Sequence, residues 1–418
     1  MTSAFLPFKE TLSPPHTRTH QNPMSSTKVE LEVPHHTAAA FKRQKHHHCH
    51  NENNDQSLLP GLPDDIAQIC LSLVHPSILY SVCHSWRRLI YSPSFPPFLS
   101  IYALCVSKKA ADQASNHSTS VEFSCFEPLS CKWLSLPPPP LQFLFHHPSF
   151  ISRKLPIQSV SVSGNLVLVA ATTDQFLPAL SRPLIFNPLF QRWTYGPPFA
   201  APRRWCVAGA SRSVVYVASG IGSHYNTELA RSVEKWDLKN INNNDFRSPL
   251  GIERSWKWEK MGGLKDGKFS RESIDAIGWR GKLCMVNVKG DAAKEGKIYD
   301  VKTDAWSEMP EGMLVGWRGP AASMDEETIY VVDESKGVLR KYDSDRDMWV
   351  EIVVDDRLKG AHQTVAGGGK VCVLFGNGGG FVVMDVVAQA PKLWVVDTPA
   401  GFEAVSIHIL PRMSHTVH

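Results

Sequence analysis

The stretch that decides the fold is Thr328–Trp349, TIYVVDESKGVLRKYDSDRDMW. A first apolar run, Thr328–Val332, is followed by turn-forming residues, a second apolar run, the pair Tyr342-Asp343 and then Trp349. Short β-branched and aromatic runs separated by Gly, Asp and Ser predict antiparallel strands joined by turns. The stretch therefore predicts a small β-sheet that ends near a tryptophan.

The same unit recurs from about residue 123 onward. Further β-rich runs at Leu166–Ala170, Val214–Ala218, Leu283–Val288 and Val371–Phe375 are each followed by a second apolar run and a tryptophan. Six tryptophans, spaced by 60, 65, 48, 43 and 45 residues, mark the units: Trp133, Trp193, Trp258, Trp306, Trp349 and Trp394. A multi-strand unit repeated at about 50 residues is typical of propeller blades, so we expect a mainly β, six-bladed propeller.

The sixth unit is split between the two ends of the propeller region. Its outer strand is expected within Phe123–Leu136, and its inner strand at Glu403–Leu410. Pairing these strands in one blade would close the ring and remove the exposed sheet edges of an open one. We therefore assign residues 123–411 to the propeller and residues 412–418 to a tail.

The N-terminal region has a different composition. Residues 1–56 hold eight of the 18 histidines and little periodic hydrophobicity, which predicts a disordered His-rich tail. The run His46–His50 offers five zinc-ligand side chains, but a structural zinc site draws its ligands from a folded frame, so we expect no metal there. The basic residues Lys42–Lys45 leave a nuclear-import signal as an alternative role.

Residues 57–100 have a helical pattern. Pro63 suits a first helical position, and Asp64 and Asp65 suit the positive end of a helix. Apolar residues recur on one helical face at Ile66, Ile69, Cys70 and Leu73, and after His75-Pro76 on another at Leu79, Val82, Cys83, Trp86, Leu89 and Ile90. So short a segment cannot bury two such stripes by itself, so they should need a partner. Residues 101–122 are expected to be a linker.

Overall composition excludes several classes of protein. The chain of 418 residues is 43% apolar and 20% charged, which is typical of globular proteins, and it contains no apolar run long enough for a membrane span. A net charge of +4 is too small to indicate nucleic-acid binding. Nine cysteines without a Cys-x-x-Cys pair, and no secretory signal, indicate an intracellular protein of the nucleus or cytoplasm.

Two segments resemble known families. Leu58–Ile66, LLPGLPDDI, together with Val82–Leu89, VCHSWRRL, resembles an F-box, which joins a Leu-Pro start to a Val-Cys-x-x-Trp-Arg close. The tryptophan-spaced units resemble kelch repeats, and their order after an F-box resembles the plant F-box/kelch-repeat proteins. A WD-repeat propeller fits less well, because only Trp236-Asp237 supplies that dipeptide among the six units.

The resemblance implies a substrate receptor of an SCF-type ubiquitin ligase. In that family the F-box binds a Skp-type adaptor, which links to a cullin, and the propeller binds the target protein. Adaptor binding, or packing of the helical module, is then expected of Leu62, Pro63, Ile66, Ile69, Leu73, Val82, Trp86 and Leu89. Two alternatives remain: an ordinary helical hairpin core, and a kelch scaffold without a ubiquitin role.

The propeller loops offer a candidate target site. Basic residues recur in the loops that lead into successive innermost strands, and two tryptophans adjoin them: Lys154, Arg204, Trp205, Arg271, Trp317, Arg318 and His362. Equivalent loops open on one face, and Arg beside Trp is common in interface hot spots. We expect an acidic or phosphorylated target segment there; the alternative is solvated charges that pair with nearby Asp and Glu.

No catalytic site is expected. Cys206 adjoins the basic pair Arg203-Arg204, but Val207 and Ala208 place it in a packed strand. The propeller lacks the repeated acidic position of a hydrolase and the ligand set of a copper oxidase. We therefore expect no enzyme activity, cofactor or metal, and protein partners in place of nucleic acid or membrane.

Overall fold

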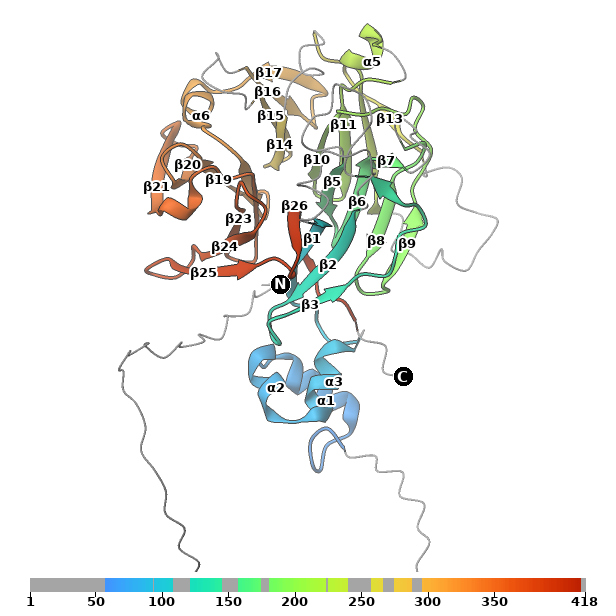
Figure 1. Ribbon diagram of the computed structural model, residues 1–418, viewed down its shortest axis with the longest axis vertical. Coiled ribbons are helices and arrows are strands. Elements are labelled where there is room, and N and C mark those ends of the chain that lie inside the picture. The colour runs from blue at the N-terminus through green and yellow to red at the C-terminus, as the bar shows by residue number, and fades with distance from the viewer. Residues whose placement is uncertain are drawn as a thin grey trace, which may run out of the picture.

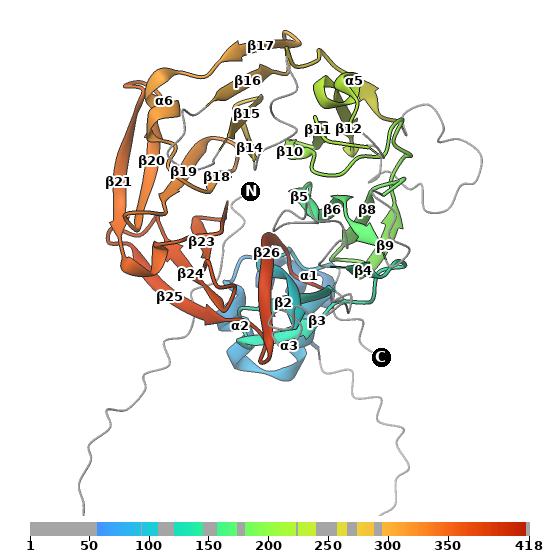
Figure 2. The same ribbon diagram turned by 45° about the horizontal axis from the view of Figure 1, so that its top comes forward.

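The computed structural model describes residues 57–92, 94–107, 121–144, 157–173, 180–222, 225–239, 257–265, 274–287 and 295–414. Six four-stranded antiparallel sheets surround a common axis as blades (Figure 2), and a small module of three helices lies at one side of the ring (Figure 1). The predicted mainly β, six-bladed propeller is confirmed. The predicted His-rich tail lies outside the described residues.

Blades 1 to 5 follow one another along the chain, each running outward from the axis. Blade 1 contains β5 (Gln158–Val162), β6 (Asn165–Ala170), β8 (Leu184–Asn187) and β9 (Arg192–Tyr195). Blade 2 contains β10 (Val207–Ser211), β11 (Val214–Ala218), β12 (Val233–Asp237) and β13 (Glu259–Lys260). Blade 3 contains β14 (Ile274–Trp279), β15 (Lys282–Asn287), β16 (Gly296–Asp300) and β17 (Ala305–Glu308).

Blade 4 contains Thr328–Trp349, the stretch that predicts a small β-sheet ending near a tryptophan. Its strands are β18 (Ala321–Met324), β19 (Thr328–Asp333), β20 (Val338–Asp343) and β21 (Met348–Val354). Blade 5 contains β22 (Gln363–Gly367), β23 (Lys370–Leu374), β24 (Gly380–Asp385) and β25 (Lys392–Asp397). A separate two-stranded sheet pairs β4 (Phe143–Leu144) with β7 (Thr172–Thr173).

Blade 6 closes the ring with strands from both ends of the propeller. Its order from the axis is β26 (Phe402–Pro411), β1 (Leu99–Ser107), β2 (Glu122–Glu127) and β3 (Lys132–Ser135). The predicted closure by N- and C-terminal strands is confirmed, and β26 lies among the first strands of the chain in Figure 2.

Two predicted boundaries are wrong at this blade. Residues 99–107 form β1 and pair with β26 along its length, so they belong neither to the F-box nor to a linker. Three of the four strands of blade 6 come from the N-terminal side, and the propeller begins at Leu99. Residues 412–414 are not a tail either, because Arg412, Met413 and Ser414 are all buried.

The six marker tryptophans explain how neighbouring blades are joined. Each lies in, or immediately before, the outermost strand of its blade. Five indole N–H groups donate to a backbone carbonyl at the end of the preceding blade or in the segment just after it, at 2.8–3.1 Å: Trp133 to Asp397, Trp193 to Pro137, Trp258 to Pro197, Trp306 to Gly262 and Trp349 to Met313. The repeat seen in the sequence is therefore a repeated inter-blade hydrogen bond.

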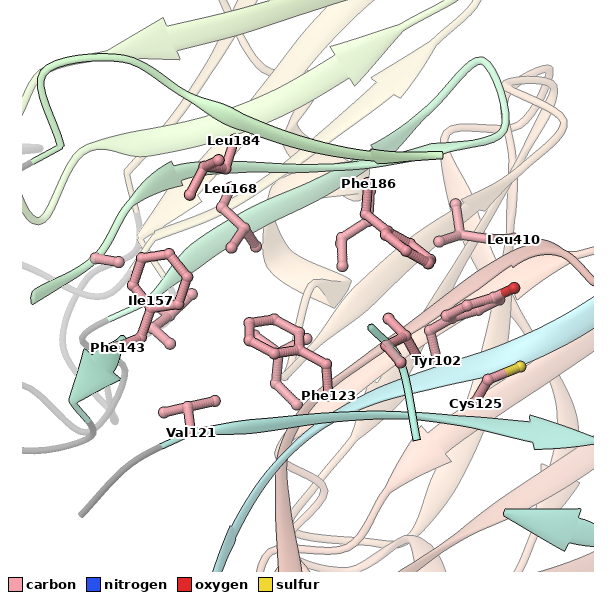
Figure 3. Close-up of a cluster of buried hydrophobic side chains, with 14 of the residues drawn as sticks. Tyr102, Val121, Phe123, Cys125, Phe143, Ile157, Leu168, Leu184, Phe186 and Leu410 are labelled. Atoms are coloured by element: carbon pink, nitrogen blue, oxygen red, sulfur yellow. The ribbon is translucent and has the colours of Figure 1, made fainter. Parts of the chain in front are cut away.

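Apolar side chains fill the space between blades. Between blades 6 and 1, Phe123 of β2, Phe186 of β8 and Leu410 of β26 lie in one buried cluster with Tyr102 of β1 (Figure 3). Each such side chain contributes roughly 1.5–3 kcal/mol by leaving water. Near the axis, Gln363 of β22 exchanges two hydrogen bonds with the backbone of Ile407.

The position of the helical module distinguishes the two faces of the propeller. Its helices are α1 (Asp64–Ser72), α2 (Pro76–Val82) and α3 (His84–Tyr91). The face on which they lie is called the near face, and β26 ends there, because the Arg412 N–H donates to the Phe98 carbonyl at 2.8 Å. The loops that enter the innermost strands open on the opposite, far face.

Three short helices lie in those propeller loops that the structure describes. They are α5 (Thr227–Arg231), α6 (Glu311–Gly316) and the 3-10 helix η4 (Asp356–Leu358). Figure 1 shows α5 and α6 at the end of the propeller away from α1–α3, which is the far face. Among the described helices, none has the length and apolar character needed to span a membrane.

Candidate functional site

The first helix of the module presents its apolar stripe to solvent. Ala67 and Leu71 form its inner face and are 0% and 3% exposed. The predicted stripe lies on the other side, where Ile66, Ile69 and Leu73 are 43%, 62% and 86% exposed. Apolar area of this kind stabilises a fold only when something covers it.

The exposed stripe continues beyond α1. Leu62 and Pro63 are exposed just before the helix, and Val82 is 53% exposed at the end of α2. Ile78 of α2 is also 56% exposed and was not among the predicted residues. The adjacent Leu79 is fully buried, and successive residues of an α-helix lie about 100° apart around its axis. An apolar residue directly beside Leu79 was therefore the signal available in the sequence.

The two remaining residues of the predicted set pack the module. Leu89 of α3 is 6% exposed and lies in a cluster with Leu71, Leu79 and Ile90. Trp86 is half-buried against the same cluster, and its indole N–H donates to the Leu58 carbonyl at 2.9 Å. The predicted set is thus divided between an outer surface and an inner core.

The module is joined to the propeller by a fully buried arginine that sequence reasoning missed. The Arg412 guanidinium donates to the carbonyls of Tyr91, Ser92 and Phe95 at 2.7–3.4 Å. It also lies within 6 Å of the ring centres of Tyr91 and Phe98. Burial lowers the pKa of Arg412 to about 10, so it remains charged at neutral pH.

Glu127 of β2 completes this joint. Its carboxylate accepts hydrogen bonds from the backbone N–H groups of Leu129 and Ser130, and from the Tyr91 hydroxyl. Burial, and then the neighbouring carboxylate, raise the pKa of Tyr91. Helix α3 and blade 6 are therefore tied together through polar groups that water cannot easily replace.

The predicted far-face residues have different fates. Arg204, Trp205 and Arg318 are described in far-face loops, with Arg318 exposed, whereas Lys154 and Arg271 lie outside the described residues. Trp317 is 0% exposed and packs in the core between blades 3 and 4, so its prediction as a surface residue is wrong.

His362 is also less available than expected. It is half-buried at the start of β22, where its backbone N–H pairs with the Leu374 carbonyl. The error at Trp317 has a physical reason. A large aromatic side chain in a loop can pack into the core as well as bind a partner, and the sequence does not tell the two roles apart.

The buried thiols are poor candidates for chemistry. Burial raises the pKa of Cys105, Cys125, Cys206 and Cys284 to about 12, so the reactive thiolate is scarce at neutral pH. Cys206 donates to the Gln158 side chain at 2.9 Å and packs between blades 1 and 2. Within the described ranges, no group of three or more His, Cys, Asp or Glu side chains could hold a metal ion.

The fold defines a class of protein: a propeller that carries, on one face, a small helical module with an uncovered apolar surface. No family model matches the chain. It is 50% identical over 388 residues to the F-box/kelch-repeat protein SKIP25 of Arabidopsis thaliana, covering 90% of this chain and 95% of that protein. It is 25% identical over 291 residues to the Arabidopsis F-box protein AFR, covering 67% and 69%. The chain therefore belongs to the F-box/kelch-repeat family.

Proposed function

We propose that this protein is a non-catalytic substrate receptor of an SCF-type ubiquitin ligase. The helical module would bind a Skp-type adaptor, which links to a cullin, and the far face would bind the target protein. The observation that carries the proposal is the exposure of Ile69 and Leu73 on a helix whose inner face is already packed. Such a role would place the protein in the nucleus or cytoplasm.

The energetics favour an adaptor on this surface. Burying a leucine or isoleucine side chain against a partner contributes roughly 1.5–3 kcal/mol. The exposed row on α1 alone therefore offers several kcal/mol without disturbing the inner cluster of Leu71 and Leu79. Trp86 and Leu89 would act indirectly, because they hold the helices in place.

The arrangement also suits a receptor in its geometry. The proposed adaptor surface lies beside the near face, and the far-face loops lie at the other end of the propeller (Figure 1). A target bound there would not compete with the adaptor for space. The rigid joint at Arg412 would hold the two ends in one relative orientation.

The test measures adaptor capture by the full chain and a double variant, Ile69→Asp with Leu73→Asp. Two charges on the exposed stripe should reduce affinity for a Skp-type adaptor by at least about a hundredfold, because each would be buried without a partner. Both side chains lie outside the module core, so the melting temperature should change little. A matched control is Val387→Asp, which charges an exposed valine of blade 5.

Unchanged adaptor affinity in the double variant, with the control also unchanged, would refute the proposed adaptor surface. Equal losses in the double variant and in Val387→Asp would also count against it, because charge alone would then explain the effect.

A further inference from the structure

The loop before β10 is held rigidly by a buried ion pair. Arg203 is 1% exposed, and its guanidinium contacts the Glu234 carboxylate of β12 at 2.6 Å. The same guanidinium donates to the Ser219 carbonyl at 3.2 Å and to the Ser232 hydroxyl at 2.7 Å. The loop residues that follow Arg203 are therefore anchored to the body of blade 2.

The next residue is fixed through its backbone. Arg204 and Ile221 exchange two backbone hydrogen bonds, both 2.8 Å long, which join the two far-face loops of blade 2. Gly220 makes this close approach possible, because a Cβ there would lie 3.0 Å from the Arg204 carbonyl oxygen and its φ is +101°. The loop is thus held through the backbone of Arg204, and these two hydrogen bonds do not involve its side chain.

That side chain is arranged as a recognition group. Its guanidinium carbon lies 4.5 Å from the ring centre of Trp205, so the two groups form a cation–π pair. The Nε atom is shielded from water and has no hydrogen-bond partner among the described residues. A partly dehydrated guanidinium gains more from an incoming anion than a fully hydrated one does.

The backbone beside it is strained. Trp205 has a φ of +54°, in the left-handed region that bulky side chains rarely adopt. Residues held in such conformations cluster at binding sites, where the surrounding fold maintains them. Here the fold maintains the strain through the Arg203–Glu234 pair and the Arg204–Ile221 bridge.

Several described acidic groups of the far-face loops and the adjoining strand ends are already engaged. Glu234 pairs with Arg203, Asp355 with Arg357, and Asp356 with Lys359. Asp275, at the start of β14, accepts a 2.6 Å hydrogen bond from the Ala321 backbone N–H. Neither Arg204 nor Arg318 forms an ion pair with any described residue, although the exposed acids Glu228 of α5 and Glu311 of α6 also lie in far-face loops.

We propose that the Arg204–Trp205 pair is the anchor point for an anionic side chain of the target protein, either a carboxylate or a phosphate group. The inference rests on the proposed function, and it names the chemistry that the far face would select. The guanidinium would bind two oxygens of the anion while the indole excludes water from one of its faces. Arg318 would add long-range attraction without fixing the geometry.

The test uses the full chain and three degenerate peptide libraries that differ only in one fixed central residue: glutamate, phosphoserine or glutamine. The wild-type chain should retain the glutamate or the phosphoserine library in preference to the glutamine library, and the better retained of the two identifies the anion. Arg204→Gln and Arg204→Lys should each reduce that preference about tenfold or more, because lysine lacks the planar stacked fork. The matched control, Arg346→Gln, alters an exposed arginine of the β20–β21 turn.

Equal retention of all three libraries, or the same loss in Arg346→Gln, would overturn the inference. Each variant is also tested for adaptor capture. Intact adaptor capture with no anion preference would overturn this inference alone, whereas absent adaptor capture by the wild-type chain would refute the proposed function. Arg204→Lys keeps the charge and the backbone bridge, so it remains informative if Arg204→Gln folds poorly.

Discussion

At the scale of single residues, the marker tryptophans show why this residue type is the one that repeats. An indole offers a large apolar surface and one donor at a fixed distance from the backbone. In blade 4 the Trp349 ring packs on Tyr342, while its N–H reaches the Met313 carbonyl at 3.0 Å. Phenylalanine would supply the surface without the hydrogen bond. The sequence spacing therefore predicted the blades well, because five of the six marker tryptophans combine the same ring packing with the same kind of hydrogen bond.

His408 provides a residue-scale prediction about pH. It is buried at the seam between β26 and β5, where its ring nitrogens contact the hydroxyl groups of Ser159, Ser161 and Ser406 at 2.9–3.3 Å. Burial lowers the pKa of His408 from 6.5 to about 4.

Because the folded pKa is lowered, the unfolded chain binds the proton more readily between these two values. Stability should therefore be unaffected by His408 above about pH 6.5 and should fall as the pH approaches 4, by no more than about 3 kcal/mol. Denaturant unfolding at pH 7 and pH 5 measures this, and a His408→Gln variant should show a smaller difference between the two. An identical pH dependence in the variant would contradict the prediction.

At the scale of elements, β1 is the strand that sequence reasoning could not place. Its residues, LSIYALCVS, form a nearly continuous apolar run that carries no tryptophan and no turn signal at its end. Both faces of the strand are covered, by blades 5 and 1, so no alternation marks it as β-structure. The predicted end of the F-box, at residue 100, was also placed too far toward the C-terminus, because β1 begins at Leu99.

Arg412 was missed for a similar reason, since a basic residue six positions before the last residue, His418, has no distinguishing pattern. Its role depends on three backbone carbonyls that only the folded chain brings together. The far face was partly predicted: basic and aromatic residues do occur there, but burial of Trp317 depends on blade packing, which local sequence does not reveal.

The joint between α3 and blade 6 yields an element-scale prediction. In an Arg412→Ala variant, the buried carbonyls of Tyr91, Ser92 and Phe95 lose their donor, and Tyr91 and Phe98 lose a packing partner. The joint should weaken by about 3–5 kcal/mol, as expected when one partner of a buried charged network is removed. Limited proteolysis should then cut the chain between residues 92 and 98 faster than in the wild type. An exposed-arginine control, Arg346→Ala, should leave the cleavage rate unchanged.

At the scale of the whole molecule, the ring is closed by a single strand that belongs to the other end of the chain. β26 contributes buried Ala404, Ile407 and Leu410, and its backbone pairs with β1 from Leu99 to Ser107. Loss of this strand would expose the edge of β1 and remove one wall of two inter-blade cores.

Deletion of residues 402–418 should therefore destabilise the entire propeller and not blade 6 alone. Loss of several buried apolar side chains should lower the melting temperature by at least about 10 °C. Differential scanning calorimetry of the truncated chain, with a control that lacks only residues 415–418, measures the effect. A melting temperature within 2–3 °C of the wild type, on the order of the shift from a single weak contact, would contradict it.

The position of β26 also has a consequence for protein synthesis. When β1 leaves the ribosome, β2 follows soon, but its other pairing partner, β26, has not yet been made, because about 295 residues separate Ser107 from Phe402. At roughly 5–20 residues per second, the nascent chain carries β1 with this edge unpaired for about 15–60 s. During that interval β1 is available to chaperones and to other nascent chains. A messenger RNA that lacks the codons for β26 would produce protein molecules in which this edge of β1 stays unpaired.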